Sequence, residues 1–116
     1  MADLNHLHLH VADPERSKRF YESWFGFREH VRHGDILFLR DGAGFDLALA
    51  PEAAPAKFPS WFHFGFRLGS ADDVRSLHHQ MTEAKADDLR DLHDEPEFVT
   101  FRVRDPDGYG IEVYWE

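Results

Sequence analysis

The order of strands and helices predicted from this sequence repeats once along the chain. In each half, a segment of alternating polar and apolar residues comes first, a helix follows, and three further strand-like segments complete the unit. The halves span residues 1–50 and 61–116, and residues 51–60, which contain three prolines, are expected to link them. A unit with the order βαβββ cannot close its own sheet, so we expect an α+β fold in which two such modules pair around a shared concave space.

The first half starts with a strand over residues 4–11 that carries three histidines on one face. His6, His8 and His10 alternate there with leucines and a valine. Asp13 caps the following helix, Pro14 occupies its first turn, and Gly26 ends it. Three short strands are expected after the helix, at residues 28–33, 36–40 and 45–50.

The second half follows the same order and ends in a strand that carries a glutamate. His63 lies in its first strand, residues 61–68, and Ser70 caps its helix. Further strands are expected at residues 87–93, 98–104 and 110–116, the last after an Asp-Pro-Asp-Gly turn. Because side chains alternate along a strand, Glu112 faces away from the core face that holds Ile111 and Val113.

Composition excludes several classes of function. One domain is expected from 116 residues, and the net charge of −9 disfavours nucleic acid and anionic membranes as partners. The chain has no cysteine, which excludes disulfides and thiolate chemistry. No apolar run approaches the roughly 20 residues of a membrane span, and no signal peptide is visible at the N-terminus. A soluble cytoplasmic protein is expected.

Three residues are candidate metal ligands: His6, His63 and Glu112. The two histidines occupy the same place in the first strands of the two halves, and Glu112 lies on the non-core face of the last strand. Ionised carboxylates are almost never buried unpaired, so Glu112 faces either water or a cavity where something positive meets it. Two imidazoles and one carboxylate can hold a divalent ion and leave positions open for substrate. A single strand histidine is more often a surface residue, but three residues in register favour a site.

Several motifs together give the sequence a family resemblance. They are residues 4–13, Ser17, Phe20-Tyr21-Glu22, Phe25-Gly26-Phe27, Phe62-His63-Phe64-Gly65-Phe66 and Asp105-Pro106-Asp107-Gly108-Tyr109 with Glu112. With these motifs the chain resembles the vicinal oxygen chelate superfamily, the group of glyoxalases, bleomycin resistance proteins and extradiol dioxygenases. The resemblance implies paired βαβββ modules that form an open barrel around a metal site, usually in a homodimer. It also implies that His6, His63 and Glu112 bind one divalent metal ion (Fe, Mn, Zn, Co or Ni), within one chain or across a swapped dimer.

The resemblance leaves the reaction open. Glyoxalase I enzymes carry a fourth ligand, a glutamate, where this chain has Ala48, which argues against that activity. Fosfomycin-resistance transferases share the ligand set, but their phosphonate-gripping residues are not visible here. Extradiol dioxygenases add a histidine and a tyrosine; His93 has compatible spacing, and Arg102 stands in the place of the tyrosine. Three ligands slightly favour extradiol-type oxygen chemistry over lyase, isomerase or thiol-transferase chemistry. The alternative is a metal-free ligand-binding dimer of the bleomycin-resistance type.

Other residues share the predicted site face by strand parity. His8, His93 and Arg102 are candidate catalytic residues. His8 is a candidate general acid or base, because an imidazole near a metal can move a proton at neutral pH. Candidate substrate-binding residues are Trp61, Arg67, Thr100 and Tyr114. Arg67 and Arg102 favour a small anionic or catechol-like substrate, since a guanidinium matches a carboxylate or phosphate. His8 could equally point to a solvated strand end, and both arginines could balance acidic residues at a wet rim.

Overall fold

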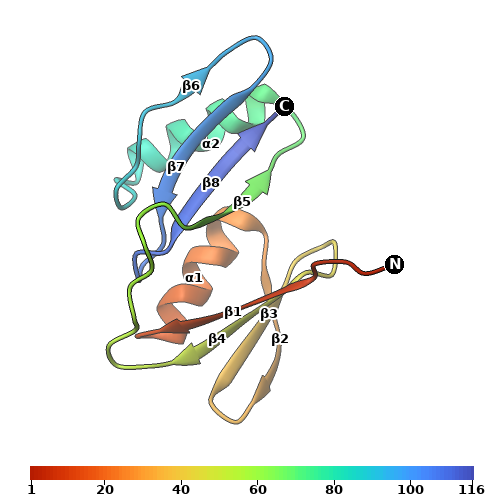
Figure 1. Cartoon of the computed structure of the whole chain (residues 1–116), viewed down its shortest axis with the longest axis vertical. Helices are drawn as coiled ribbons and strands as arrows, with labels where there is room; N and C mark the ends of the chain where they lie inside the picture. The colour runs from red at the N-terminus through yellow and green to blue at the C-terminus, as the bar shows by residue number, and fades with distance from the viewer. The chain divides into compact units, whose positions relative to one another are not determined.

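The computed structural model describes all residues from 1 to 116 and divides into two units. We call residues 1–56 the N-terminal unit and residues 57–116 the C-terminal unit (Figure 1). The N-terminal unit contains β1 (His6–Val11), α1 (Pro14–Phe25), β2 (Arg28–His33), β3 (Ile36–Arg40) and β4 (Asp46–Pro51). The C-terminal unit contains β5 (His63–Arg67), α2 (Ala71–Glu83), β6 (His93–Asp94), β7 (Val99–Arg104) and β8 (Gly110–Trp115). The predicted βαβββ order is confirmed in both units.

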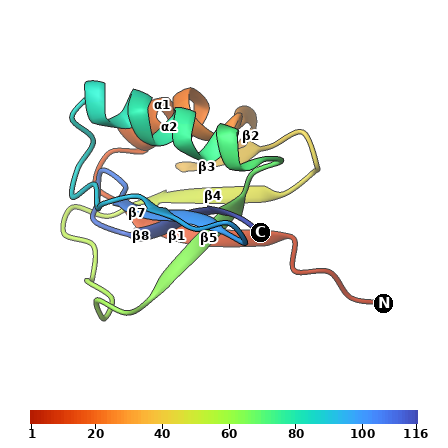
Figure 2. The ribbon, with the colours of Figure 1, turned by 90° about the horizontal axis from the view of Figure 1, so that it is seen from above.

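Each unit has two layers, one sheet and one helix (Figure 2). The N-terminal sheet has the order β1-β4-β3-β2, and the C-terminal sheet has the matching order β5-β8-β7-β6. In both sheets the first and last strands of the unit pair in parallel, while the other pairs are antiparallel. In each unit the helix carries the chain back along one face of the sheet, and the next strand forms the far edge. The remaining two strands return toward the first, so the last strand pairs with it in parallel.

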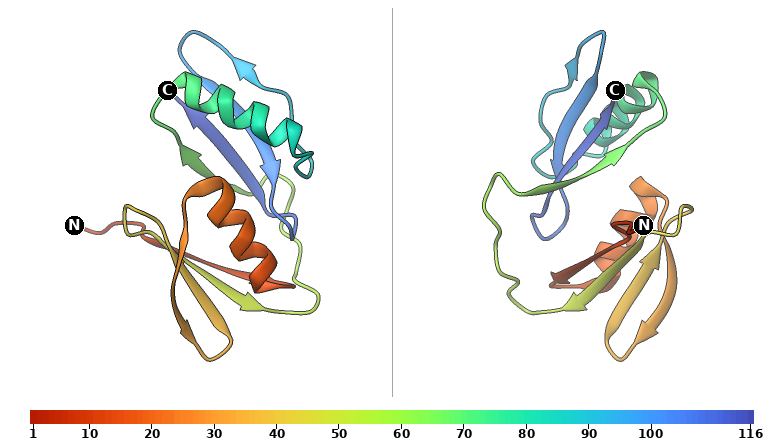
Figure 3. Two further views of the ribbon diagram at one scale, coloured as in Figure 1. Left: turned by 180° about the vertical axis from the view of Figure 1, so that it is seen from behind. Right: turned by 45° about the vertical axis from the view of Figure 1, so that its right-hand side comes forward.

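The N-terminal core lies between α1 and the apolar face of its sheet (Figure 3). Tyr21 of α1 is fully buried, and so are the leucines of the two central strands, Leu37, Leu39, Leu47 and Leu49. Burial of each leucine contributes on the order of 1.5–3 kcal/mol. Because side chains alternate along a strand, the histidines of β1 lie on the opposite face of the sheet.

The C-terminal core has the same construction. Five residues of β7 and β8 are buried on the face that α2 covers: Val99, Phe101, Val103, Ile111 and Val113. Val74 and Met81 of α2 pack against them and are buried as well. The residues between these apolar positions, among them Thr100, Arg102 and Glu112, therefore lie on the face that α2 leaves open.

Both helices begin at the caps that the sequence predicts. The Asp13 side chain accepts hydrogen bonds from the backbone N–H groups of Glu15 and Arg16, at 3.1 and 3.3 Å. Ser70 accepts one from Asp73 N at 3.1 Å. These contacts pair helix N–H groups that otherwise have no partner. Gly26 ends α1 with a φ of 72°, a conformation that glycine adopts without strain.

The Asp-Pro-Asp-Gly turn between β7 and β8 forms as predicted. Asp105 is buried, and its Oδ1 accepts hydrogen bonds from the N–H groups of Asp107 and Tyr109, both at 2.9 Å. Gly108 has a φ of 89°, which other residues rarely adopt. The turn sets the register of β8 against β7 and so decides which face carries Glu112.

One predicted strand is much shorter in the structure. A strand over residues 87–93 was expected, but β6 contains only His93 and Asp94. The reason is a left-handed kink: Asp88 has a φ of 49°, and an aspartate tolerates this conformation better than most residues. The segment still runs beside β7, because Arg90 N donates to Arg102 O at 2.9 Å and Arg104 N donates to Asp87 O at 3.0 Å. We call residues 85–92 the Asp88 loop.

Neither helix has the length and apolar character needed to cross a membrane.

Candidate metal centre

The open face of the C-terminal sheet gathers most of the predicted site residues in three rows across its strands. In one row Gly65 lies opposite Glu112, which lies opposite Arg102. The next row contains Arg67, Tyr114, Thr100 and His93. The third contains His63, Gly110 and Arg104. Residues directly opposite each other share a face, so these side chains project from the same side of the sheet.

His63 and Glu112 face each other across this surface. His63 Nε2 lies 3.6 Å from Glu112 Oε1, and each side chain is about one-third exposed, at 30% and 31%. His63 Nδ1 lies 3.0 Å from the carbonyl oxygen of Trp61. A carbonyl can only accept, so Nδ1 carries the proton of the neutral imidazole and Nε2 carries the lone pair. The nitrogen that can bind a metal is therefore the one turned toward the carboxylate.

The second oxygen of Glu112 is held by Thr100. Thr100 Oγ1 donates to Glu112 Oε2 at 2.9 Å, and Oε1 is left facing His63. His63 and Glu112 border an open depression of about 530 Å³, which Thr100 and Tyr114 also line. Metal-binding histidines and carboxylates are usually oriented by a second hydrogen bond of this kind. His63 and Glu112 thus fit two positions of a metal site.

Two glycines leave room beside this pair. A Cβ atom at Gly110 would lie 3.0 Å from Phe62 O and 3.4 Å from His63 Cβ. At Gly65, directly opposite Glu112, a Cβ atom would lie 3.3 Å from Glu112 O. A side chain at either position would push against the strands that carry His63 and Glu112.

The histidines of β1 lie on the open face of the N-terminal sheet. The Nδ1 of His6 bonds the side-chain oxygen of Asn5 at 3.0 Å, which leaves its Nε2 as the lone-pair nitrogen. His8 packs against His10 with ring centroids 5.3 Å apart, and His10 Nδ1 bonds Glu52 Oε2 at 2.9 Å. His6 therefore has the same tautomer as His63, the one that offers Nε2 to a ligand.

The N-terminal unit lacks a counterpart of Glu112. Ala48 lies opposite His8 in the parallel pair of β1 and β4, as Glu112 lies opposite Gly65 in the pair of β5 and β8. Ala48 is buried, and its methyl side chain has no atom that can bind a metal. Asp46, opposite His6, does not replace it, because Arg40 bonds both of its oxygens, at 2.7 and 3.2 Å. This pairing with Arg40 also holds the pKa of Asp46 below its ordinary value.

Comparison with known proteins identifies the family. The model of the glyoxalase/bleomycin resistance protein/dioxygenase superfamily matches residues 3–113. The chain belongs to this superfamily. A search of curated proteins gave no significant match.

Solved structures of the superfamily share the fold of the whole chain. A possible glyoxalase from Bacillus cereus is 29% identical, with a TM-score of 0.81 over 97% of this chain and 98% of that one. The fosfomycin resistance protein FosX from Listeria monocytogenes is 16% identical, with a TM-score of 0.86 over 100% and 94%. Lactoylglutathione lyase from Agrobacterium tumefaciens is 20% identical, with a TM-score of 0.75 over 99% and 94%. At identities this low, the last two show the fold alone.

Of the predicted superfamily ligands, the structure brings His63 and Glu112 together in the C-terminal unit, while His6 belongs to the N-terminal unit. Neither unit by itself contains a group of three or more His, Asp or Glu side chains arranged to hold a metal. The complete triad therefore stays a prediction that takes residues from both units. Sequence reasoning missed the hydrogen-bond partners of His6, His63 and Glu112. No sequence pattern indicates that the backbone carbonyl of Trp61 accepts from His63. The partner of His6 has a weak sequence signal, because Asn5 stands directly before it.

The remaining predicted site residues of the C-terminal unit differ in their exposure and contacts. Tyr114 lines the depression beside Glu112, and His93 is exposed opposite Thr100. Arg67 Nη2 donates to the carbonyl of Glu116 at 2.7 Å. Trp61 is 71% exposed and its ring packs edge-on against Phe62, so the observed contribution of this residue to the site is its backbone carbonyl.

Proposed function

We propose that the chain is a metal-dependent enzyme in which His6, His63 and Glu112 hold one divalent ion. The ligand set would be completed within one chain or across a homodimer. The substrate would be a small molecule that chelates the ion through one or two oxygens. The observation that carries the proposal is the pair His63 Nε2 and Glu112 Oε1, which face each other at 3.6 Å while the second polar atom of each side chain is held by another residue.

The residues of the chain have separate roles in this proposal. The Trp61 carbonyl fixes the tautomer of His63, and Thr100 fixes the orientation of Glu112. A divalent ion bound there would supply Lewis-acid stabilisation of negative charge on the substrate oxygens. His93, opposite Thr100, is exposed on the same face and is the candidate for moving a proton. His8 has the same candidate role on the N-terminal sheet.

The number of ligands bears on the reaction. Ala48 stands where a fourth, carboxylate ligand would be needed, so the site has three protein ligands and more open positions. This favours oxygen-dependent opening of a catechol-like ring over the isomerisation or lyase chemistry of glyoxalase I. The metal could be Fe, Mn, Zn, Co or Ni by ligand type, and Fe(II) suits the oxygen chemistry.

A second function is favoured by the lining of the depression. Its border includes two acidic residues and four aromatic residues: Glu112, Glu116, Phe64, Phe98, Tyr114 and Trp115. Acidic and aromatic side chains suit a flat cationic ligand. A metal-free binding dimer of the bleomycin-resistance type would use the same surface without catalysis.

Metal content separates the two functions. The full chain is purified anaerobically without a metal-affinity tag and analysed for metals, together with His63→Ala, Glu112→Gln and, as a matched control, His79→Ala. His79 is an exposed helix residue whose only observed partner is Glu83, at 3.9 Å. We expect near-stoichiometric metal in the wild type and the control and loss of metal in the other two variants. Oxygen uptake with a panel of catechols then tests the reaction class.

Thermal unfolding gives an independent measure of metal binding. A metal that binds only the folded chain stabilises it by about 2.7 kcal/mol at about 100 times its Kd. A wild-type protein that contains no metal and gains no stability from Fe(II), Mn(II), Co(II), Ni(II) or Zn(II) would refute the enzyme proposal. Metal without oxygen uptake would refute only the dioxygenase part.

A further inference from the structure

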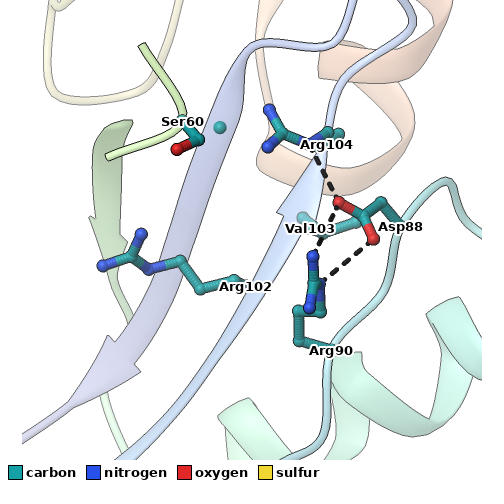
Figure 4. A pocket seen from close by; sticks show the side chains of 7 residues that line it. Ser60, Asp88, Arg90, Arg102, Val103 and Arg104 are labelled. Carbon is teal, nitrogen blue, oxygen red and sulfur yellow. Dashed lines mark hydrogen bonds and ion pairs between the residues drawn. The ribbon is translucent and has the colours of Figure 1, made fainter. Parts of the chain in front are cut away.

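Three arginines surround a second hollow in the C-terminal unit. This hollow, the arginine pocket, has a volume of about 250 Å³ and is bordered by Ser60, Asp88, Arg90, Arg102 and Arg104 (Figure 4). Asp88 is the only acidic residue on its border. Three guanidinium groups and one carboxylate leave two positive charges unbalanced, in a chain whose net charge is −9. The pocket therefore differs in sign from the protein as a whole.

Asp88 forms ion pairs with two of the three arginines. Its Oδ2 accepts from Arg104 Nε at 2.9 Å, and its Oδ1 lies 3.1 Å from Arg90 Nε. Arg104 Nη1 also donates to the carbonyl of Gly108 at 2.7 Å. Arg104, followed by Arg90, holds the pKa of Asp88 below its ordinary value, so this carboxylate stays charged. The pair of arginines is thus fixed in place but only half neutralised.

The loop that carries Arg90 is fastened at several points. Its backbone makes two hydrogen bonds to β7, Arg90 N to Arg102 O and Arg104 N to Asp87 O. His78 of α2 adds a third contact, because its Nε2 donates to the Arg90 carbonyl at 2.9 Å. Arg90 and Arg104 are therefore held before any ligand arrives, which lowers the entropy cost of binding.

Arg102 is the free member of the group. Its guanidinium has no hydrogen bond or ion pair with any other residue of the C-terminal unit, although it lies in the same row as Glu112. Figure 4 shows its side chain extending away from Asp88, on the other side of the pocket from Arg90 and Arg104. A free guanidinium fork is suited to bidentate contact with an oxyanion.

The pocket adjoins the candidate metal centre through a third hollow that shares lining residues with both. Arg90 and Arg102 also border a hollow of about 470 Å³ that His93, Thr100 and Glu112 line. Arg102 and Glu112 are direct cross-strand partners, and such residues have Cα atoms about 4.5–5.5 Å apart. One small molecule can therefore reach both Glu112 and the free arginine.

We propose that the arginine pocket binds an oxyanion group of the substrate, a carboxylate, phosphate or phosphonate. The substrate class is then a small molecule with chelating oxygens at one end and an oxyanion at the other. The anion-binding half of this inference stands on the arginines alone, and the two-ended substrate rests on the proposed function. Arg102 makes the direct contact, while Arg90 and Arg104 supply the surrounding positive charge.

The test is anion binding by the metal-free full chain. Inorganic phosphate and, separately, benzoate are titrated at low ionic strength into ¹⁵N-labelled protein, and amide and arginine Nε chemical shifts are followed. We expect saturable shifts at residues 88–90 and 102–104. Comparing the two probes shows whether phosphate or carboxylate binds more tightly.

Variants identify the contact. We expect Arg102→Gln to weaken binding at least tenfold and Arg102→Lys, which keeps the charge and loses the fork, to weaken it less. The control is Arg19→Gln, an exposed residue of α1 that undergoes the same loss of charge, and its affinity should equal that of the wild type. Because the guanidinium of Arg102 has no polar partner in its unit, replacing the side chain should leave folding unchanged.

The outcomes separate this inference from the proposed function. Shifts that do not saturate, or equal affinity in Arg102→Gln and Arg19→Gln, would overturn the arginine pocket even if the protein binds metal. Phosphate binding that persists in His63→Ala while metal binding is lost would support the pocket, because the two sites then act independently. Saturable, Arg102-dependent binding in a protein that binds no metal would support the pocket and remove the chelating end of the substrate.

Discussion

The hydrogen bond from Thr100 to Glu112 allows a sharp test of the candidate metal centre. Thr100→Val removes the hydroxyl that donates to Glu112 Oε2 at 2.9 Å and keeps the shape of the side chain nearly unchanged. A hydrogen bond contributes about 0.5–1.5 kcal/mol to stability. Glu112 is 31% exposed, so water can replace the lost donor. We therefore expect the free energy of unfolding to fall by about 0.5 kcal/mol, at the low end of that range.

The effect on metal affinity should be larger than the effect on stability. Without Thr100 the carboxylate can rotate, and Oε1 no longer faces His63 Nε2 for most of the time. Loss of a residue that orients a metal ligand typically costs about 10–100-fold in affinity. Because Glu112 is one of three proposed ligands and is partly solvated, we expect about tenfold, which corresponds to about 1.4 kcal/mol. Thr100→Ser keeps the hydroxyl and should bind metal within about twofold of the wild type.

The assay is competition for Co(II) or Zn(II) against a chromophoric chelator at fixed pH, with thermal unfolding of each variant as a check on folding. If Thr100→Val binds metal as tightly as the wild type, Thr100 does not orient a ligand, and the role proposed for its hydrogen bond to Glu112 is refuted. If Thr100→Ser weakens binding as much as Thr100→Val, the methyl contacts matter instead of the hydroxyl.

Three further predictions concern the fold. Gly108→Ala places a side chain at a φ of 89° and should lower the free energy of unfolding in urea by about 1–3 kcal/mol; an unchanged value would show that the turn can rearrange. Asp88 has a lowered pKa, so its stabilising contribution is present above its unfolded value of about 3.9 and is lost as pH falls through the lower folded value. Wild-type stability should therefore fall more steeply below about pH 4 than that of Asp88→Asn, and parallel curves would contradict this. Leu49→Ala, at a fully buried position, should cost about 2–5 kcal/mol in the same urea assay, and a cost under about 1 kcal/mol would show that the core refills the cavity.

Strand parity carried most of the predictive power of the sequence. Alternation in residues 110–116 placed Glu112 opposite the core face, and the structure has Ile111 and Val113 fully buried with Glu112 on the other side. The predictions for residues 28–33 and 36–40 match β2 and β3 residue for residue. β2 has no buried residue, but β3 and β8 alternate buried and more exposed residues, so a shift of register by one residue would expose their apolar side chains. The pattern therefore permits a single alignment.

The Asp88 loop shows where such reasoning fails. The apolar residues Leu89 and Leu92 in residues 87–93 are too few to fix a period, and the backbone of Asp88 takes a left-handed conformation that propensity does not reveal. Long-range partners decide the local structure instead. Arg104 and Arg90 converge on Asp88, and the loop bonds to β7 at two places. These contacts join residues that are up to 17 positions apart, from Asp87 to Arg104. A pattern within residues 87–93 therefore cannot predict them.

The two sheets also show why one sequence motif can be repeated without repeating its chemistry. His6 and His63 occupy the same place in β1 and β5, and each offers Nε2 because another residue accepts from its Nδ1. The carboxylate appears only once, since Ala48 stands where the other unit has Glu112. Neither unit thus carries the whole proposed ligand set. If the triad is correct, metal binding ties an N-terminal unit to a C-terminal unit, and metal affinity then depends on their association as much as on the ligands themselves.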